Sequence, residues 1–201
     1  MHPTLRALLG ATLLPACSAA AATSTLDISG TITVKAAPCE ISIADQDNLA
    51  FGQIAYEKLK PSEMTELAAV TLPATLTCPN GARRVQMSFV DNMDPSTMRE
   101  NFTIKDRTDT SKLAGVYIVR LMDGVNQGRL SGIWRFDGNN HAQLDDRAWA
   151  NTPGSGMGFL QEVQNASFNI NVKPRLLSQA AFSPADEIDL IGSFTINLIY
   201  I

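Results

Sequence analysis

The feature that most constrains the fold is the alternation of apolar and polar residues in many short segments. Residues 26–34 carry Leu26, Ile28, Ile32 and Val34 on one face and Asp, Ser and Thr on the other, and residues 166–173 repeat this pattern. A period of two places successive side chains on opposite sides of a strand with one buried face. We find no helical pattern of ten residues or more, no internal repeat and no interdomain linker. Many short strands at this spacing predict an all-β fold, a β-sandwich of one domain.

The expected strands are spread along the whole chain. Pro73 indicates an edge strand or a bend, because proline cannot donate a ladder hydrogen bond. Asp123-Gly124 is expected to turn one strand into a hairpin partner. Residues 55–65 predict a loop or one helical turn, and the Gly- and Asn-rich residues 137–158 predict a mobile surface excursion. The strands are expected at 26–34, 41–43, 49–54, 66–78, 85–90, 115–122, 129–136, 166–173 and 191–201.

The first 22 residues have the pattern of a secretory signal peptide. Arg6 precedes a short apolar run, and small residues up to Ala22 follow it, so we expect cleavage after Ala22 and a single domain over 23–201. A lipid anchor on Cys17 is the alternative, although Pro15 fits a lipobox poorly. No segment of the mature chain has the roughly 20 apolar residues of a membrane helix, so no integral membrane span is expected.

Composition excludes two classes of protein. Hydrophobic residues make up 45% of the chain and charged residues 18%, which argues against intrinsic disorder. The formal net charge is −4 and no dense basic stretch is present, so nucleic acid is not an expected partner.

Signal cleavage leaves two cysteines, Cys39 and Cys78, in an oxidising compartment. Neither has a second Cys or His two to four residues away, so the spacing of a zinc site is absent. We therefore expect a disulfide, which on the chain-entropy model stabilises the fold by about 4 kcal/mol. Two separate buried thiols are the alternative.

Catalytic motifs are missing. His141 lies in a turn-rich segment, and no Gly-x-Ser-x-Gly, phosphate-binding loop or calcium loop accompanies it. The adjacent Asp145 and Asp146 would point to opposite sides of an extended chain and make a poor acid–base pair. We expect no enzyme activity, no catalytic or metal site and no cofactor.

Two tryptophans flank the Gly- and Asn-rich segment. Trp134 and Trp149, beside Asn and Asp residues, could form a sugar-binding platform. Packing of these rings in the core or along a strand is the plainer alternative.

The end of the chain carries an apolar face up to its last residues. Chain ends are usually frayed, so an ordered strand here needs a partner for its face and for its edge. Ile199 and Ile201 are apolar residues on the opposite face of this strand, which suggests that the opposite face is covered too. The residues of the first face are Phe194, Ile196, Leu198 and Tyr200.

The order of motifs resembles that of subunits of bacterial chaperone–usher fimbriae. The alternating N-terminal segment ends in Ala-Ala-Pro-Cys39, and Phe51-Gly-Gln-Ile54 and Thr75-Leu-Thr-Cys78 follow. Residues 114–124 come next, and a glycine and an alternating strand with a penultimate Tyr200 close the chain. The middle and the length resemble more specifically an uncharacterised family of GltF-type periplasmic, fimbrial-subunit-like domains of unknown function. The resemblance covers about residues 26–201.

This resemblance implies an immunoglobulin-like sandwich that lacks its last strand. A periplasmic chaperone would supply the strand, and the N-terminal extension of a neighbouring fimbrial subunit would replace it at an outer-membrane usher. The chain would pass through the periplasm to the cell surface. The acceptor strand would be residues 194–200.

The donor extension is less clearly defined. A donor segment would carry a glycine at the tightest pocket, and Leu26, Ile28, Gly30, Ile32 and Val34 have that pattern. Cys39 follows Gly30 by only nine residues, so the same segment would have to serve both as donor and as first strand. Either the extension is short, or this subunit does not donate.

Two other functions stay open. One is a free-standing periplasmic immunoglobulin-like binding or scaffolding protein that completes its own sandwich. The other is a tip lectin that uses the Trp134–Trp149 region, although tip adhesins carry an extra receptor domain.

Overall fold

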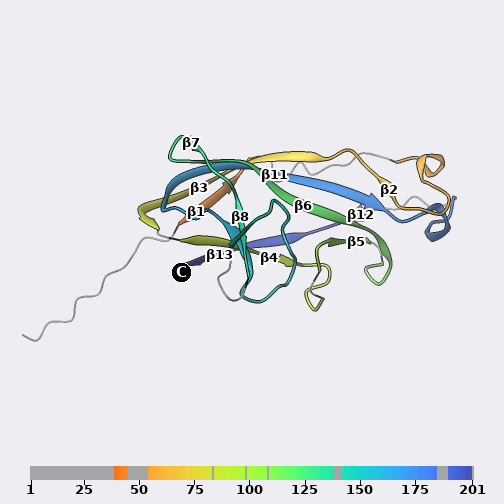
Figure 1. The fold of residues 1–201 in the computed structure, drawn as a ribbon. Helices are drawn as coiled ribbons and strands as arrows, with labels where there is room; N and C mark the ends of the chain where they lie inside the picture. Colours follow the sequence, from red (N-terminus) through yellow and green to blue (C-terminus); the bar gives the residue numbers. More distant parts are fainter. Residues whose placement is uncertain are drawn as a thin grey trace, which may run out of the picture. The chain divides into compact units, whose positions relative to one another are not determined.

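The computed structural model describes residues 39–44, 54–82, 84–97, 99–107, 109–137, 142–184 and 190–200, all within one compact unit, Ala36–Ile201. Strands dominate this part of the chain (Figure 1). Its helical elements are two single 3-10 turns, Tyr56–Lys58 and Gln179–Ala181. Within the described residues, no helix has the length and apolar character that crossing a membrane requires.

The first sheet has eight strands, and every pair in it is antiparallel. Two short strands attach to its sides: β2 (Thr65–Glu66) pairs with β11, and β7 (Arg129–Leu130) pairs with β6. The main order is β1 (Glu40–Ile43), β3 (Val70–Ala82), β11 (Val163–Leu176), β6 (Leu113–Asn126), β5 (Phe102–Asp106) and β12 (Leu190–Ile191).

The second sheet has five antiparallel strands. Their order is β13 (Phe194–Tyr200), β4 (Val85–Asp91), β10 (Gly156–Gly158), β8 (Trp134–Phe136) and β9 (Ala142–Leu144).

Side chains from both sheets form one buried cluster. Leu76, Val119 and Ile170 enter it from the first sheet, and Met87 and Phe89 enter it from the second. Two antiparallel sheets that share one core make a β-sandwich. The all-β sandwich expected from the sequence is therefore confirmed.

Several expected strands are present and one is longer than expected. Residues 41–43 and 85–90 lie in β1 and β4, and residues 166–173 form the middle of the longer β11. The 3-10 turn Tyr56–Lys58 lies within the segment that predicted a loop or one helical turn.

The expected strand 66–78 is shifted along the chain. β3 begins at Val70 and continues to Ala82, while Thr65–Glu66 forms the separate strand β2. Pro73 lies where β1 ends, and its carbonyl accepts a hydrogen bond from the Ala44 amide at 2.8 Å. Its missing N–H points to the same side, where β1 ends, so the pairing of β3 with β11 loses no hydrogen bond, which explains a proline in an inner strand.

The turn expected at Asp123-Gly124 is wrong. β6 runs through both residues to Asn126, and the chain turns at Gln127 and Gly128, whose φ angles are 51° and 76°. The hairpin partner is only the two residues of β7, because the chain then crosses to the second sheet as β8. Asp123 has a φ of 54° near a register shift in the β11–β6 pairing. This positive φ, which is common in turns, therefore occurs here at an irregularity within the strand.

The mobile surface excursion expected at 137–158 is also wrong for its described part. β10 is buried and lies between β4 and β8. A side chain at Gly158 would collide with the backbone carbonyl of Val85 on β4. This glycine therefore allows close strand pairing, and it is not a sign of mobility.

The expected strand 191–201 is two strands in different sheets. Leu190–Ile191 pairs with β5 as β12, and Phe194–Tyr200 pairs with β4 as β13. Gly192 lies between them against the ring of Tyr117, where a Cβ atom would come within 2.8 Å of a ring carbon.

Some expectations fall outside the described residues. These are the signal peptide 1–22, the candidate donor segment 26–34 and His141. The expected strand 49–54 also lies there except for Ile54, which is not in a strand.

Candidate functional site

The second sheet ends at β13, which pairs with β4 and with no other strand of the described chain. The carbonyl of Ser193 accepts a hydrogen bond from the Asn92 amide at 3.0 Å. Backbone groups of alternate residues in a strand point to the same side, so Thr195, Asn197 and Ile199 also direct theirs toward β4. The N–H and C=O groups of the residues between them, Phe194, Ile196 and Leu198, point away from β4, toward the free edge.

The side chains of β13 present an apolar row at this edge. We use the term apolar row for Phe194, Ile196 and Leu198, which are half-buried and pack against the core. Tyr200 continues the same face and is 51% exposed. The structure thus places these four residues on the face that the alternation predicts, and large apolar side chains there are only partly covered.

The first sheet has a matching edge at β1. Ile41 and Ile43 of β1 are partly buried and pack against the core. The Ala44 amide bonds to β3, so the backbone groups of Ile41 and Ile43, an odd number of residues away, point away from β3. The sequence had indicated this strand but not its role as an edge.

Phe194 is the most deeply anchored member of the apolar row. Its ring centroid lies 5.5 Å from that of Phe102, 6.1 Å from that of Tyr117 and 6.2 Å from that of Phe89. Phe102 and Tyr117 belong to the first sheet and Phe89 to the second. The start of β13 therefore holds the two sheets together as well as lining the edge.

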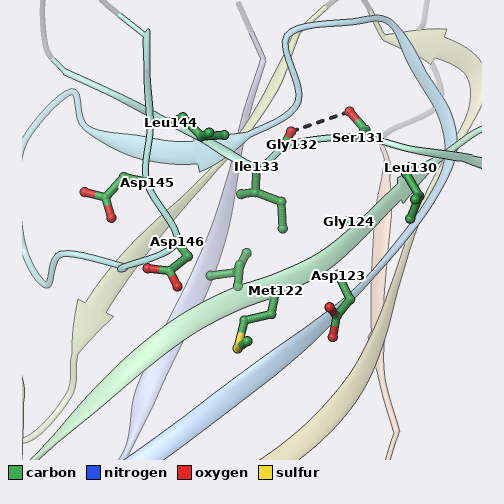
Figure 2. Close-up of a pocket in the computed structure, with 11 residues that line it drawn as sticks. Met122, Asp123, Gly124, Leu130, Ser131, Gly132, Ile133, Leu144, Asp145 and Asp146 are labelled. Atoms are coloured by element: carbon green, nitrogen blue, oxygen red, sulfur yellow. Dashed lines mark hydrogen bonds between the residues drawn. The ribbon is translucent and has the colours of Figure 1, made fainter.

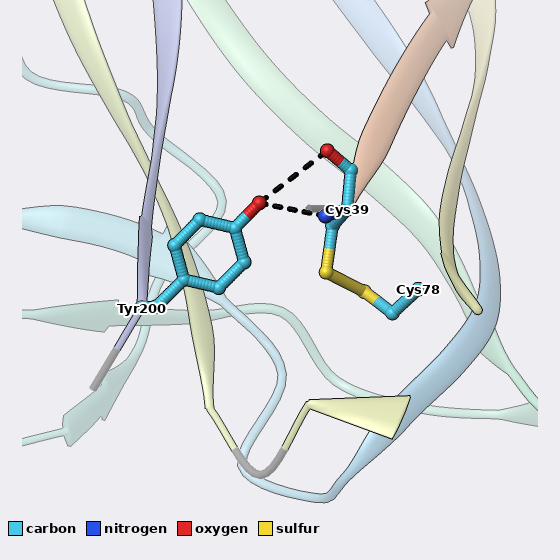
Figure 3. The surroundings of a disulfide bond; sticks show 3 residues. All are labelled: Cys39, Cys78 and Tyr200. Atoms are coloured by element: carbon cyan, nitrogen blue, oxygen red, sulfur yellow. Dashed lines mark hydrogen bonds between the residues drawn. A yellow bond between two sulfur atoms is a disulfide. The ribbon is translucent and has the colours of Figure 1, made fainter. Parts of the chain in front are cut away.

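The other end of β13 is tied to the start of β1 (Figure 3). The Cys39 amide donates a hydrogen bond to the Tyr200 hydroxyl at 2.7 Å, and that hydroxyl lies 3.4 Å from the Cys39 carbonyl oxygen. Cys39 also forms the expected disulfide with Cys78, and the two Cα atoms are 4.2 Å apart. The disulfide and the tyrosine thus link β13, β1 and β3 at one end of the sandwich.

A buried polar cluster lies beside the start of β13. Asp91, opposite Phe194, accepts hydrogen bonds from the backbone amides of Met93 at 2.9 Å and Thr103 at 2.8 Å. Asn151 accepts a hydrogen bond from the Asp91 amide and donates to two backbone carbonyls of the 94–97 loop. These groups are occupied with backbone partners, so they brace the loop and offer no free acid or base.

Tyr117 lies close to this cluster and has a buried hydroxyl without a hydrogen-bond partner. Burial raises the pKa of Tyr117 above its ordinary value of 10.0, and the negative charge of Asp91 raises it further. The phenol is therefore held in its neutral form.

The acidic pair singled out from the sequence is divided between two ion pairs. Asp145 contacts Arg135 at 3.2 Å, and Asp146 contacts Arg120 at 2.9 Å. Arg135 also lies 4.2 Å above the ring of Trp149. The two carboxylates do not form an acid–base pair, and one face of Trp149 is already covered by a guanidinium group. Trp134 lies on β8 and is half-buried.

A shallow depression of about 650 Å³ lies beside the β6–β7 hairpin (Figure 2). Met122, Leu130, Ile133 and Leu144 line it together with the carboxylates of Asp123, Asp145 and Asp146. Leu130 is 89% exposed and Leu144 is 65% exposed, which the sequence did not indicate. Among the described residues, no group of three or more His, Cys, Asp or Glu could hold a metal ion.

Comparisons with known proteins give the following similarities. A family model described as Fimbrial protein matches residues 26–159, more than half of the chain. The crystal structure of the P pilus rod subunit PapA is 16% identical, with 87% of this chain and 99% of that chain covered and a TM-score of 0.45. A chain from a chaperone–tip adhesin complex of CFA/I fimbriae biogenesis is 12% identical, with 80% of this chain and 41% of that chain covered and a TM-score of 0.36. No curated protein sequence matches this chain significantly.

Proposed function

Because the chain belongs to the fimbrial protein family, we propose that it is a structural subunit whose β13 edge accepts a strand from another chain. The observation that carries this proposal is the free side of β13 in the described chain, next to a half-buried apolar row. An edge of this kind offers unpaired N–H and C=O groups together with uncovered apolar surface. An added strand would satisfy both, since main-chain hydrogen bonds give affinity and side-chain pockets give specificity.

We assign the incoming strand to two successive partners. A periplasmic chaperone would cover the edge first, and a neighbouring fimbrial subunit would take its place at the outer-membrane usher. The signal-peptide pattern of residues 1–22 supports export to the periplasm and then to the cell surface. This assignment gives the protein a structural role without catalysis.

The donor segment is a second part of the proposal. Residues 26–34 have the period-two apolar pattern and the glycine that a donor strand requires, so we propose that they donate to the next subunit. The more specific kinship with GltF-type periplasmic domains also remains a proposal, supported by the length and the middle of the chain.

Co-expression with the cognate chaperone tests the edge assignment. Leu198→Asp places a charge in the apolar row and should abolish co-purification with the chaperone, because an unpaired buried charge is costly. Asn197→Asp is the matched control, since Asn197 is exposed on the other face of the same strand and its variant should co-purify like the wild type. Removal of Tyr200-Ile201 is a milder change that shortens the strand without adding a charge.

Two outcomes would contradict the proposal. One is equal chaperone capture by the wild type, Leu198→Asp and the truncated chain. The other is a wild-type chain that stays monomeric in the periplasm and forms no complex with a co-expressed chaperone. The second result would favour a free-standing protein that completes its own sandwich.

A further inference from the structure

The alternating pattern of β13 leaves the position of an incoming strand undefined. A strand that slides by two residues keeps every side chain on the same face, so its apolar residues meet the apolar row again. The candidate donor segment, residues 26–34, repeats its apolar residues at the same period. Gly30 is the one interruption of this repeat, and a feature at the end of the edge would hold the register in addition to it.

Tyr200 provides such a feature. It is the last described residue of β13, and its ring extends from the second sheet to the start of β1, where the hydroxyl meets the backbone of Cys39 (Figure 3). The hydroxyl accepts from the Cys39 amide at 2.7 Å and lies 3.4 Å from the Cys39 carbonyl. The two sheet edges are thus bridged at this end.

Cys39 cannot easily move away from this bridge. Its side chain is bonded to Cys78, and the next residue, Glu40, is already paired with Thr77 of β3. Cys39 is only 8% exposed, so water has little access to replace the tyrosine as the hydrogen-bond partner of its amide. A buried donor left without a partner is unfavourable.

We propose that Tyr200 is a positioning residue that stops the incoming strand and fixes its register. This inference rests on the proposed function. The strand can cover the apolar row as far as Leu198, because any slide past that point must break the contact between Tyr200 and Cys39. The aromatic ring gives the Tyr200 side chain the length to reach Cys39, and the hydroxyl makes the hydrogen bond that resists displacement of the ring by the incoming strand.

Site-specific photo-crosslinking tests this inference on the exported chain, residues 23–201. The probe is a synthetic peptide of residues 23–36 with a benzophenone side chain in place of Ile32, and mass spectrometry locates the crosslinked residue. The wild type should give crosslinks concentrated at one residue of β13. In Tyr200→Phe the ratio of registers shifted by two residues to the main register should rise about fivefold, the factor that one ordinary hydrogen bond represents.

Tyr117→Phe is the matched control. It makes the same chemical change at a hydroxyl that has no hydrogen-bond partner, so its crosslinks should match those of the wild type. A second variant, Tyr200→Leu, removes the ring as well and should broaden the register at least as much as Tyr200→Phe. A free-thiol assay on each variant reports whether the Cys39–Cys78 disulfide has formed, and urea unfolding reports whether the domain has folded.

Three results separate the possibilities. Broadened crosslinks in both Tyr200 variants support the stop. A single wild-type register in both variants overturns it while leaving strand acceptance intact. Absence of any crosslink to β13 in the wild type overturns strand acceptance and the stop together.

Discussion

The ring of Phe194 packs against that of Phe102 with 5.5 Å between the ring centroids, which joins an edge strand of one sheet to β5 of the other. An edge residue that only awaited a partner would contribute little to the isolated fold. Phe194 instead belongs to a four-ring cluster, so the start of β13 is part of the subunit's own core.

We therefore expect Phe194→Ala to lower the free energy of unfolding by about 3 kcal/mol, near the lower end for a buried phenylalanine. Leu198→Ala, at the half-buried other end of the apolar row, should cost about 1 kcal/mol. Urea unfolding of the isolated subunit measures both. Equal losses would show that the strand is anchored uniformly along its length.

The disulfide should account for a large share of the stability. The loop that it closes spans 39 residues. On the chain-entropy model, the double variant Cys39→Ser/Cys78→Ser should lose about 4 kcal/mol in urea unfolding. A loss below about 1 kcal/mol would mean that the denatured chain keeps these two segments together without the bond.

Substitution of Asn151 is expected to lower the free energy of unfolding, because its backbone has a positive φ and its side chain is held in hydrogen bonds. Its φ is 55°, and its side chain makes three hydrogen bonds with backbone groups. Asn151→Ala should cost about 3 kcal/mol, and Asn151→Gly about 1 kcal/mol less, because glycine adopts a positive φ without strain. The difference between the two variants in urea unfolding isolates the backbone contribution, and equal losses would contradict it.

The buried Tyr117 hydroxyl should make the fold sensitive to alkali. Its pKa is raised in the folded state, so folding favours the protonated phenol. This contribution is complete below the ordinary pKa of 10.0 and is lost as the pH rises above it, because the unfolded chain then releases a proton that the folded chain retains. Above about pH 10 the unfolding free energy of the wild type should fall more steeply than that of Tyr117→Phe, by about 1.4 kcal/mol per pH unit. Parallel curves for the two proteins would contradict the burial argument.

Alternation predicted the sandwich and most of its long strands, because a buried face imposes a period of two on the sequence. The predictions failed where glycine or aspartate had a tertiary role. The sequence around Gly158 predicts a loop, yet this residue is glycine because the Val85 carbonyl of the neighbouring strand leaves no space for a side chain. Asp123 suggested a turn, but its positive φ lies inside β6. Neither role is visible before the strands are paired.

The site could be predicted in part for the same reason. The face shared by Phe194, Ile196 and Leu198 follows from local periodicity. The contact between Tyr200 and Cys39 joins residues 161 positions apart and depends on how the two sheets meet, so no local pattern could indicate it. The exposure of Leu130 also depends on the tertiary fold. The chain passes from the first sheet to the second after β7, whereas the sequence predicts one continuous strand over residues 129–136.

Amide hydrogen exchange on β13 tests most directly whether this strand accepts a partner. The amides of Thr195, Asn197 and Ile199 point toward β4 and should be protected in the isolated subunit, whereas those of Ile196 and Leu198 point to the free edge and should exchange quickly. Addition of the chaperone or of a peptide of residues 23–36 should slow exchange at Ile196 and Leu198 while Thr195 and Asn197 stay unchanged. Strong protection of Ile196 and Leu198 before any partner is added, or no change after its addition, would contradict the account.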